Sequence, residues 1–208
     1  MTKRLNGTGE KPDPQYQRDA YDWYREPPAC VEALADVIDF SGSLVWDPCA
    51  GGGNILDVFK ARGHATIASD IVDRSPRHKF FRGNFLQCTK WPMAHDRPLD
   101  LITNPPYGYI KGIAETMMRH ACNTIPFRYA AFLLPIEFLA SSGRSKLFSE
   151  FRPSHVVICS QRPSMPPGAM VEAMGADAYR GGMADYVWIV HKPPFKWRTE
   201  LLWTRPTA

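Results

Sequence analysis

Residues 43–70, SLVWDPCAGGGNILDVFKARGHATIASD, decide the fold class. A short apolar run at 43–47 ends in Asp47 and leads into three consecutive glycines. Residues 54–63 then place apolar side chains at helical spacing, and a second short apolar run, 65–70, again ends in an acid. A strand, a glycine loop, a helix and a second strand in this order predict a βαβ unit with parallel strands.

The same alternation continues along the rest of the chain. Helical spacing is found at 27–40, 112–124 and 143–151, and further apolar runs typical of strands lie at 78–85, 99–104, 129–135, 155–160 and 184–192. The pattern predicts an α/β protein with a mostly parallel sheet. Because ligands bind beyond the carboxyl ends of such strands, we expect Asp47, Asp70, Asn84 and Asn104 to line one rim.

The bulk composition is that of one soluble globular domain. The 208 residues are 44% hydrophobic and 22% charged, and the net charge of +4 is compatible with a nucleic-acid partner without arguing for one. We expect a mobile arm at 1–18, a domain at 19–192 with an irregular loop at 160–183, and a basic, aromatic tail at 193–208.

The cysteines and histidines show no pattern of a metal site. The five cysteines are widely spaced and form no C-x-x-C pair, and no histidine lies at zinc-finger spacing to them. Free thiols in a reducing compartment are the simpler interpretation. The N-terminus lacks the apolar stretch of a signal peptide, and no run reaches transmembrane length, so we expect a soluble, cytoplasmic protein.

The glycine loop has features of a nucleotide site. Gly51, Gly52 and Gly53 let the backbone approach a ligand closely, although they form neither G-x-G-x-x-G nor a Walker-type loop. Asp70 ends the next strand, where a Rossmann-like unit uses an acid to accept hydrogen bonds from ribose hydroxyls. The structural alternative is a tight βα turn that merely needs glycines.

A second motif, NPPY at 104–107, directly follows an apolar strand. Prolines end a strand and stiffen the backbone after it, so the motif predicts a rigid platform at the rim. Alone, it is equally compatible with a strand-end turn that buries its tyrosine.

Together the two motifs point to a known family. In sequence, order and spacing, DPCAGGGNIL (47–56) and NPPY resemble the D-P-x-x-G-x-G loop and the [DNS]-P-P-[YFW] motif of S-adenosylmethionine-dependent amino-methyltransferases. The resemblance runs from about Tyr24 to about Lys192 and is greatest to the small solitary adenine methyltransferases of bacteriophages and prophages. It implies a Rossmann-like class I methyltransferase sheet of seven strands with the last antiparallel, and S-adenosylmethionine as the cofactor.

The resemblance also implies the roles of individual residues. Asn84 and Phe85 match a family position, commonly G-D-F, that contacts the cofactor adenine, and Glu26 stands where the family usually has Thr. The implied cofactor-binding residues are Tyr24, Pro27, Asp47, Pro48, Cys49, Ala50, Gly51, Gly53, Asp70, Ile71, Asn84, Phe85 and Asn104. The implied catalytic residues are Asn104, Pro105, Pro106 and Tyr107, and the implied substrate-binding residues are Tyr107, Gly108 and Arg162.

The NPPY residues suit an attack by an aromatic amine. Such an amine is a poor nucleophile because its lone pair is delocalised into the ring. Acceptors at its hydrogens, here the Asn104 side-chain carbonyl and the Pro105 backbone carbonyl, pull the nitrogen towards a tetrahedral shape. Tyr107 offers a ring on which a base could stack, and a base in duplex DNA would first be flipped out.

The acceptor is open from sequence alone. Asn at the first motif position favours adenine over cytosine, so adenine N6 in DNA is the first hypothesis. Relatives of this motif also methylate RNA bases and protein glutamine, and a non-catalytic partner subunit is a further alternative that the intact NPPY disfavours. No segment is long enough for a separate target-recognition domain, so we expect the recognised sequence to be short, the specificity to be loose, or 160–183 and the tail to carry it.

Overall fold

The computed structural model describes residues 20–75, 77–92, 95–108, 110–182 and 184–205. The strands are β1 (Leu44–Asp47), β2 (Ala65–Asp70), β3 (Phe80–Arg82), β4 (Leu99–Thr103), β5 (Tyr129–Pro135), β6 (His155–Ile158), β7 (Tyr186–His191) and β8 (Glu200–Trp203). The α-helices are α1 (Pro28–Val37), α2 (Asn54–Ala61), α3 (Ile113–Thr124), α4 (Ser145–Glu150) and α5 (Val171–Met174). Short 3-10 turns include η1 (Ala20–Asp22), η2 (Phe85–Gln87) and η5 (Gly168–Met170). The expected arm at 1–18 lies outside the described residues.

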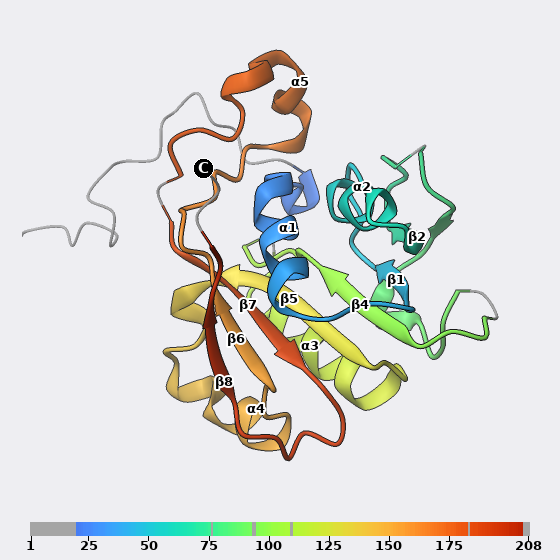
Figure 1. The fold of residues 1–208 in the computed structure, drawn as a ribbon, viewed down its shortest axis with the longest axis vertical. Helices are drawn as coiled ribbons and strands as arrows, with labels where there is room; N and C mark the ends of the chain where they lie inside the picture. The colour runs from blue at the N-terminus through green and yellow to red at the C-terminus, as the bar shows by residue number, and fades with distance from the viewer. Residues whose placement is uncertain (1–19, 76, 93–94, 109, 183, 206–208) are drawn as a thin grey trace, which may run out of the picture.

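The strands form one sheet in the order β3-β2-β1-β4-β5-β7-β6-β8 (Figure 1). Strand β7 runs antiparallel to β5 and β6, and every other pairing is parallel. The α/β class and the mostly parallel sheet are therefore confirmed. The sheet has one more strand than the seven expected, because residues 200–203 of the tail pair with β6. Leu202 packs against the core, whereas Leu201 and Trp203 are exposed.

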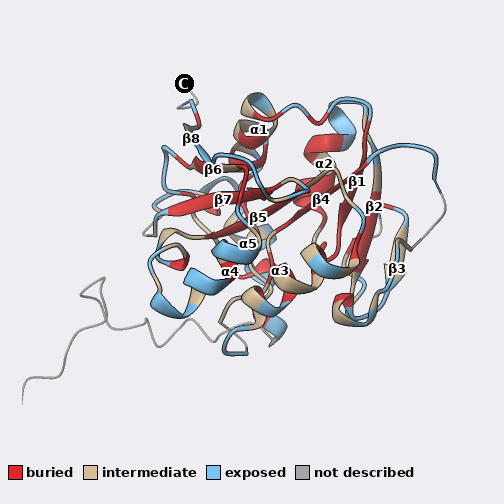
Figure 2. Ribbon diagram, turned by 90° about the horizontal axis from the view of Figure 1, so that it is seen from below, coloured by how far each residue is buried: buried red, intermediate tan, exposed pale blue. Residues whose placement is uncertain are grey.

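Helices cover both faces of the sheet, α1 and α2 on one side and α3 and α4 on the other (Figures 1 and 2). Consecutive residues of β1 show why its sequence is apolar throughout. Val45 packs with the α1 and α2 side, and Trp46 packs with the α3 and α4 side. The sequence of a strand buried on both faces is a continuous apolar run rather than an alternation of apolar and polar residues.

The sheet order brings the polar strand ends together. Strands β2, β1 and β4 are parallel neighbours, so their carboxyl ends share one edge of the sheet. Asp47 ends β1, Asp70 ends β2, and Asn104 directly follows β4. Within the part of the chain that the structure describes, no helix is long and apolar enough to cross a membrane.

The buried ring of His191 on β7 should make folding sensitive to acid. Burial lowers the pKa of His191 to about 3, against about 6.5 in an unfolded chain. As the pH falls, the unfolded chain takes up this proton before the folded chain does. The free energy of unfolding is therefore unaffected by His191 above about pH 6.5 and falls below it, by about 2 kcal/mol at pH 5. Denaturant titrations at pH 7.5 and 5 should find this loss missing from His191→Leu and retained in His95→Leu, where the ring is exposed. Equal acid sensitivity in all three proteins would contradict the assignment.

Candidate active site

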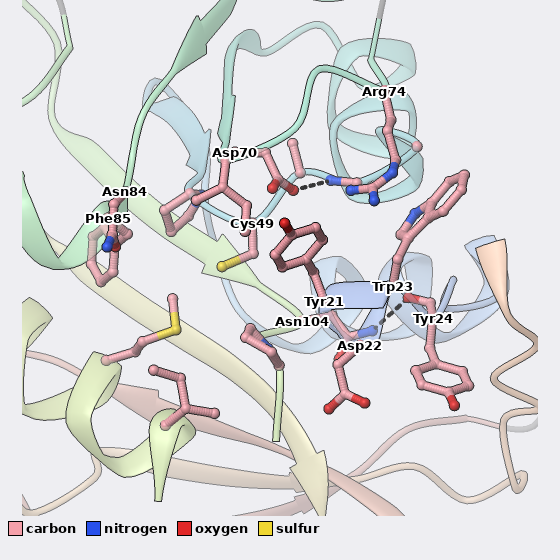
Figure 3. A pocket seen from close by; sticks show the side chains of 18 of the residues that line it. Tyr21, Asp22, Trp23, Tyr24, Cys49, Asp70, Arg74, Asn84, Phe85 and Asn104 are labelled. Carbon is pink, nitrogen blue, oxygen red and sulfur yellow. Dashed lines mark hydrogen bonds between the residues drawn. The ribbon is translucent and has the colours of Figure 1, made fainter. Parts of the chain in front are cut away.

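A cavity of about 280 Å³ opens at the rim where β1, β2 and β4 end (Figure 3). Its lining comes from separate segments of the chain. These are residues 21–26 before α1, the loop 48–52 after β1, Asp70, Ile71 and Arg74 after β2, residues 83–86, and Asn104, Pro106, Ile110, Ile113 and Met117 from β4 to α3. Eleven residues predicted from sequence line it: Tyr24, Pro48, Cys49, Ala50, Gly51, Asp70, Ile71, Asn84, Phe85, Asn104 and Pro106.

Asp47 lies beneath the loop, outside the cavity. Its Oδ1 accepts hydrogen bonds from the Cys49 backbone N–H at 3.0 Å and from the Thr103 hydroxyl at 2.8 Å. Burial raises the pKa of this carboxyl well above its ordinary value. The acid at this motif position therefore shapes the start of the loop from below.

The glycines bring the loop backbone close to other side chains. Gly51 has a φ of +47°, and a Cβ on it would lie 2.7 Å from Nε1 of Trp23. Its N–H donates to Oδ2 of Asp70 at 2.9 Å, and its carbonyl accepts from the hydroxyl of Ser75. Gly53 has a φ of +85° and packs against His78, away from the cavity. Glycine is thus required here by backbone conformation and by close approach.

Asp70 is fixed by the loop that it faces. Besides Gly51, its carboxylate accepts from the backbone N–H of Val72 at 3.2 Å, and burial raises its pKa. Asn84 also lines the cavity, but its Oδ1 already accepts from the N–H of Leu86 at 3.0 Å, where it caps η2. Phe85 is buried, with its ring against Trp46.

Asn104 has an unusual hydrogen-bond arrangement. Its Nδ2 donates to Oε2 of Glu26 at 3.0 Å and to the backbone carbonyl of Tyr24 at 3.3 Å. Its Oδ1 is buried and accepts no hydrogen bond from any residue that the structure describes. The carbonyl of Tyr24 can only accept, and Glu26 can only accept while it is ionised, so these two neighbours together orient the amide. A buried acceptor without a donor costs about 1–3 kcal/mol, so the site suits a ligand that donates.

Tyr107 turns away from the cavity. Its hydroxyl lies 2.9 Å from that of Tyr186, and its ring packs against both hydrophobic cores. The backbone N–H groups of Tyr107 and Gly108 both donate to the carboxylate of Asp22. Tyr107, Gly108 and Pro105 are not among the residues that line the cavity. A role for Tyr107 in stacking on a base therefore stays a prediction.

Two further predicted residues lie elsewhere. Pro27 precedes α1 and lines a second, smaller cavity together with Arg162. Arg162 is 60% exposed at its side chain and pairs with Asp185 at 2.7 Å. Their expected roles in binding cofactor and substrate also stay predictions.

Sequence reasoning largely missed the segment before α1, residues 21–26, which we call the N-terminal strap. All six of its residues line the cavity, and Figure 3 shows the side chains of residues 21–24 close together there. Trp23 packs between Gly51 and Gly168, and the guanidinium of Arg74 lies 4.5 Å from its ring centroid. The Nε1 of Trp23 is buried and donates to no residue that the structure describes. The dense aromatic run YDWY was the available signal.

The irregular loop 160–183 holds the strap in place. The N–H of Gly168 donates to the carbonyl of Trp23 at 2.8 Å, and the N–H of Arg25 donates to the carbonyl of Pro166 at 3.0 Å. Tyr24 and Pro167 form an antiparallel bridge. The loop therefore supports the cavity indirectly, through the strap.

Gly168→Ala should loosen this contact. The added Cβ would lie 2.1–2.6 Å from three ring atoms of Trp23, so the ring must move. Overpacking of this kind costs about 1–3 kcal/mol, which a denaturant titration would measure. Gly143→Ala is the matched control, because a Cβ there meets only Ser141, at 3.7 Å. Equal stability of the two variants would show that Trp23 is not held against Gly168.

Comparisons with known proteins place the fold. The sequence matches no protein-family model and no curated protein. A structure from Pyrococcus horikoshii, provisionally described as an RNA methyltransferase, aligns with 83% of this chain and 87% of its own, at 14% identity and a TM-score of 0.58. The 23S rRNA methyltransferase ErmE aligns over 82% and 69%, at 13% identity and a TM-score of 0.51. The chain shares the fold of these two structures.

The third similar structure belongs to a larger protein. The type IIG restriction endonuclease BpuSI aligns with 81% of this chain over 24% of its own length, at 14% identity and a TM-score of 0.51. In the present chain, the cavity lies beyond the carboxyl ends of the parallel strands, where open α/β sheets bind their ligands.

Proposed function

We propose that the protein is an S-adenosylmethionine-dependent methyltransferase that methylates an exocyclic amine, with adenine N6 of DNA as the first candidate. The observation that carries the proposal is the orientation of Asn104. Its amide N–H groups are held by the strap, and its carbonyl oxygen is buried without a donor among the described residues. An amine hydrogen is the donor that would complete it.

The residues of the cavity fit the proposed cofactor. Asp70 presents a carboxylate suited to ribose hydroxyls, and the glycine loop allows close approach of the methionine part. The Nε1 of Trp23 lies beside Gly51 and has no acceptor among the described residues, so it is a donor suited to a carboxylate or hydroxyl oxygen. Asn84 and Phe85 would take the adenine ring. Bound there, S-adenosylmethionine supplies an electrophilic methyl group on a sulfonium.

Asn104 would act on the amine directly. Its Oδ1 accepts one amine hydrogen, which draws the nitrogen towards a tetrahedral shape and frees the lone pair for an in-line attack. Because Pro105 and Pro106 follow in the chain, the acceptor is held in place before the reaction, so little reorganisation is needed. Pro105 lies outside the cavity lining, so Asn104 is the acceptor that the geometry favours.

An RNA base is the second candidate acceptor. Two of the similar structures above are described as RNA methyltransferases, and the net charge of +4 suits either nucleic acid. Protein glutamine offers a planar amide of similar chemistry and is a third outcome of the test.

The test offers DNA, RNA and cell-protein pools to the purified protein with methyl-labelled S-adenosylmethionine. We expect label in DNA, and chromatography of the digested nucleosides should find it on adenine N6. Label confined to RNA or to protein would show that the proposed acceptor is wrong and would leave the proposed methyl transfer to an exocyclic amine or amide in place. If no pool takes label from a folded protein that binds S-adenosylmethionine, the enzymatic proposal is wrong and a partner-subunit role replaces it.

A further inference from the structure

We propose that Glu26 is a positioning residue whose ionised carboxylate holds Nδ2 of Asn104 and so keeps the carbonyl oxygen of that amide free to accept from the amine. The catalytic consequence rests on the function proposed above, whereas the contact itself does not. Glu26 stands in the N-terminal strap and is 6% exposed. Its Oε2 accepts from Nδ2 of Asn104 at 3.0 Å, the shorter of the two contacts that this amide group makes.

The charge state of Glu26 matters because an ionised carboxylate can only accept hydrogen bonds. The Asn104 amide then presents Nδ2 to Glu26, which leaves Oδ1 without a donor among the described residues. A protonated Glu26 can donate its own O–H to Oδ1 if the amide turns over, a change that gives up the 3.3 Å contact between Nδ2 and the Tyr24 carbonyl. Nδ2 would then take the place of Oδ1, and an N–H donor there would repel the hydrogens of an amine instead of accepting one.

The strap holds Glu26 firmly enough for this role. Pro27 and Pro28 follow it and start α1, which restricts the backbone on its C-terminal side. The backbone carbonyl of Glu26 accepts from Nδ2 of Asn54, the first residue of α2, at 2.8 Å. Asn54 is in turn held by Arg25 and Tyr179. The contact between Glu26 and Asn104 therefore joins two fixed backbones.

Groups from several elements face the carboxyl of Glu26. Burial raises its pKa to about 7, while the Glu26 backbone N–H, the Asn104 amide, the Arg25 charge and the N–H of Ile55 oppose that rise. Asp47 at the end of β1 and Cys30 on α1 are the nearby acidic groups of the other elements, and the charge of Glu26 raises the pKa of both. When Glu26 ionises near neutral pH, it adds a negative charge to the site. Among the groups named here, Arg25 is the one that carries a positive charge.

The first experiment needs no activity. Side-chain ¹⁵N–¹H resonances of Asn104 in the ligand-free protein, followed from pH 5.5 to 9, should shift with a midpoint near 7 in the wild type. Glu26→Gln should abolish that shift. Glu32→Gln on the exposed side of α1 removes the same charge and should retain it. A wild-type midpoint that persists in Glu26→Gln, or no shift in the wild type, would overturn the inference.

The second experiment measures turnover on the acceptor that takes label. Glu26→Ala should lower kcat by about 10- to 100-fold, the scale of loss seen when an outer-shell partner that orients a metal ligand is removed. Glu26→Gln should recover most of this loss, because its Oε1 can still accept from Nδ2. The wild-type kcat/KM should rise with pH through about 7, as expected for a group titrating in the free enzyme, and this rise should vanish in Glu26→Gln.

These outcomes separate the two proposals. If the Asn104 resonances follow Glu26 but no pool takes label, the positioning contact stands and the proposed function fails. If methyl transfer occurs with the same kcat and pH profile in Glu26→Ala as in the wild type, the proposed function stands and the positioning role is wrong.

Discussion

Asn104→Ala should fold, bind S-adenosylmethionine with nearly wild-type affinity and transfer methyl groups about 10²–10³-fold more slowly. The reason is that the Oδ1 acceptor matters most as the amine nitrogen becomes tetrahedral, so its loss belongs to the chemical step. The substitution removes no contact of the glycine loop or of Asp70. Calorimetry with the cofactor and single-turnover methyl transfer would measure the two quantities separately.

Asn104→Asp is the informative companion to this variant. It keeps an acceptor oxygen but places a second carboxyl where Nδ2 now lies 3.0 Å from Oε2 of Glu26. Two carboxylates so close do not both ionise, so one of them should hold a proton at neutral pH. We expect turnover between that of Asn104→Ala and the wild type. Wild-type turnover in Asn104→Ala would contradict the proposed function, which depends on the Asn104 carbonyl.

The sequence predicted the framework of the fold because that framework is locally encoded. The run from Leu44 to Asp70 contains its own strand, glycine turn, helix and second strand, and all of them form where the spacing predicts. Strand β8 was not predicted. Its residues come after a proline-rich segment, and only pairing with β6 and packing of Leu202 make them a strand. Such long-range pairing leaves no local pattern.

The candidate site also has a part that the sequence predicted and a part that it did not. Asp70 and Asn104 were expected at the rim because strand ends in a parallel sheet must meet there. The N-terminal strap depends instead on contacts across more than a hundred residues, such as Trp23 against Gly168. The sequence could not decide the direction of the Tyr107 side chain either, because its partner Tyr186 lies on a strand 79 residues away. Side-chain direction is set by tertiary packing rather than by the motif.

Asp70→Ala should weaken binding of S-adenosylmethionine by about 1.5–3 kcal/mol, the value of a hydrogen bond to a charged group. This corresponds to an increase in Kd of about 10- to 150-fold. The expected reason is the loss of a carboxylate that accepts from the ribose hydroxyls. Asp70 also accepts from the N–H groups of Gly51 and Val72, so the substitution loosens the loop as well, and a simple loss of affinity would not identify the ribose contact.

A double-mutant cycle with the ligand separates these two effects. Calorimetry would compare S-adenosylhomocysteine with its analogue lacking the ribose hydroxyls, on the wild type and on Asp70→Ala. If Asp70 binds the ribose, removing the hydroxyls should weaken binding to the wild type and hardly affect Asp70→Ala, because their contact is already lost. If the hydroxyls contribute equally in both proteins, Asp70 acts only by shaping the loop at Gly51. The ribose would then be held by another group of the rim, and the role assigned to Asp70 would be wrong.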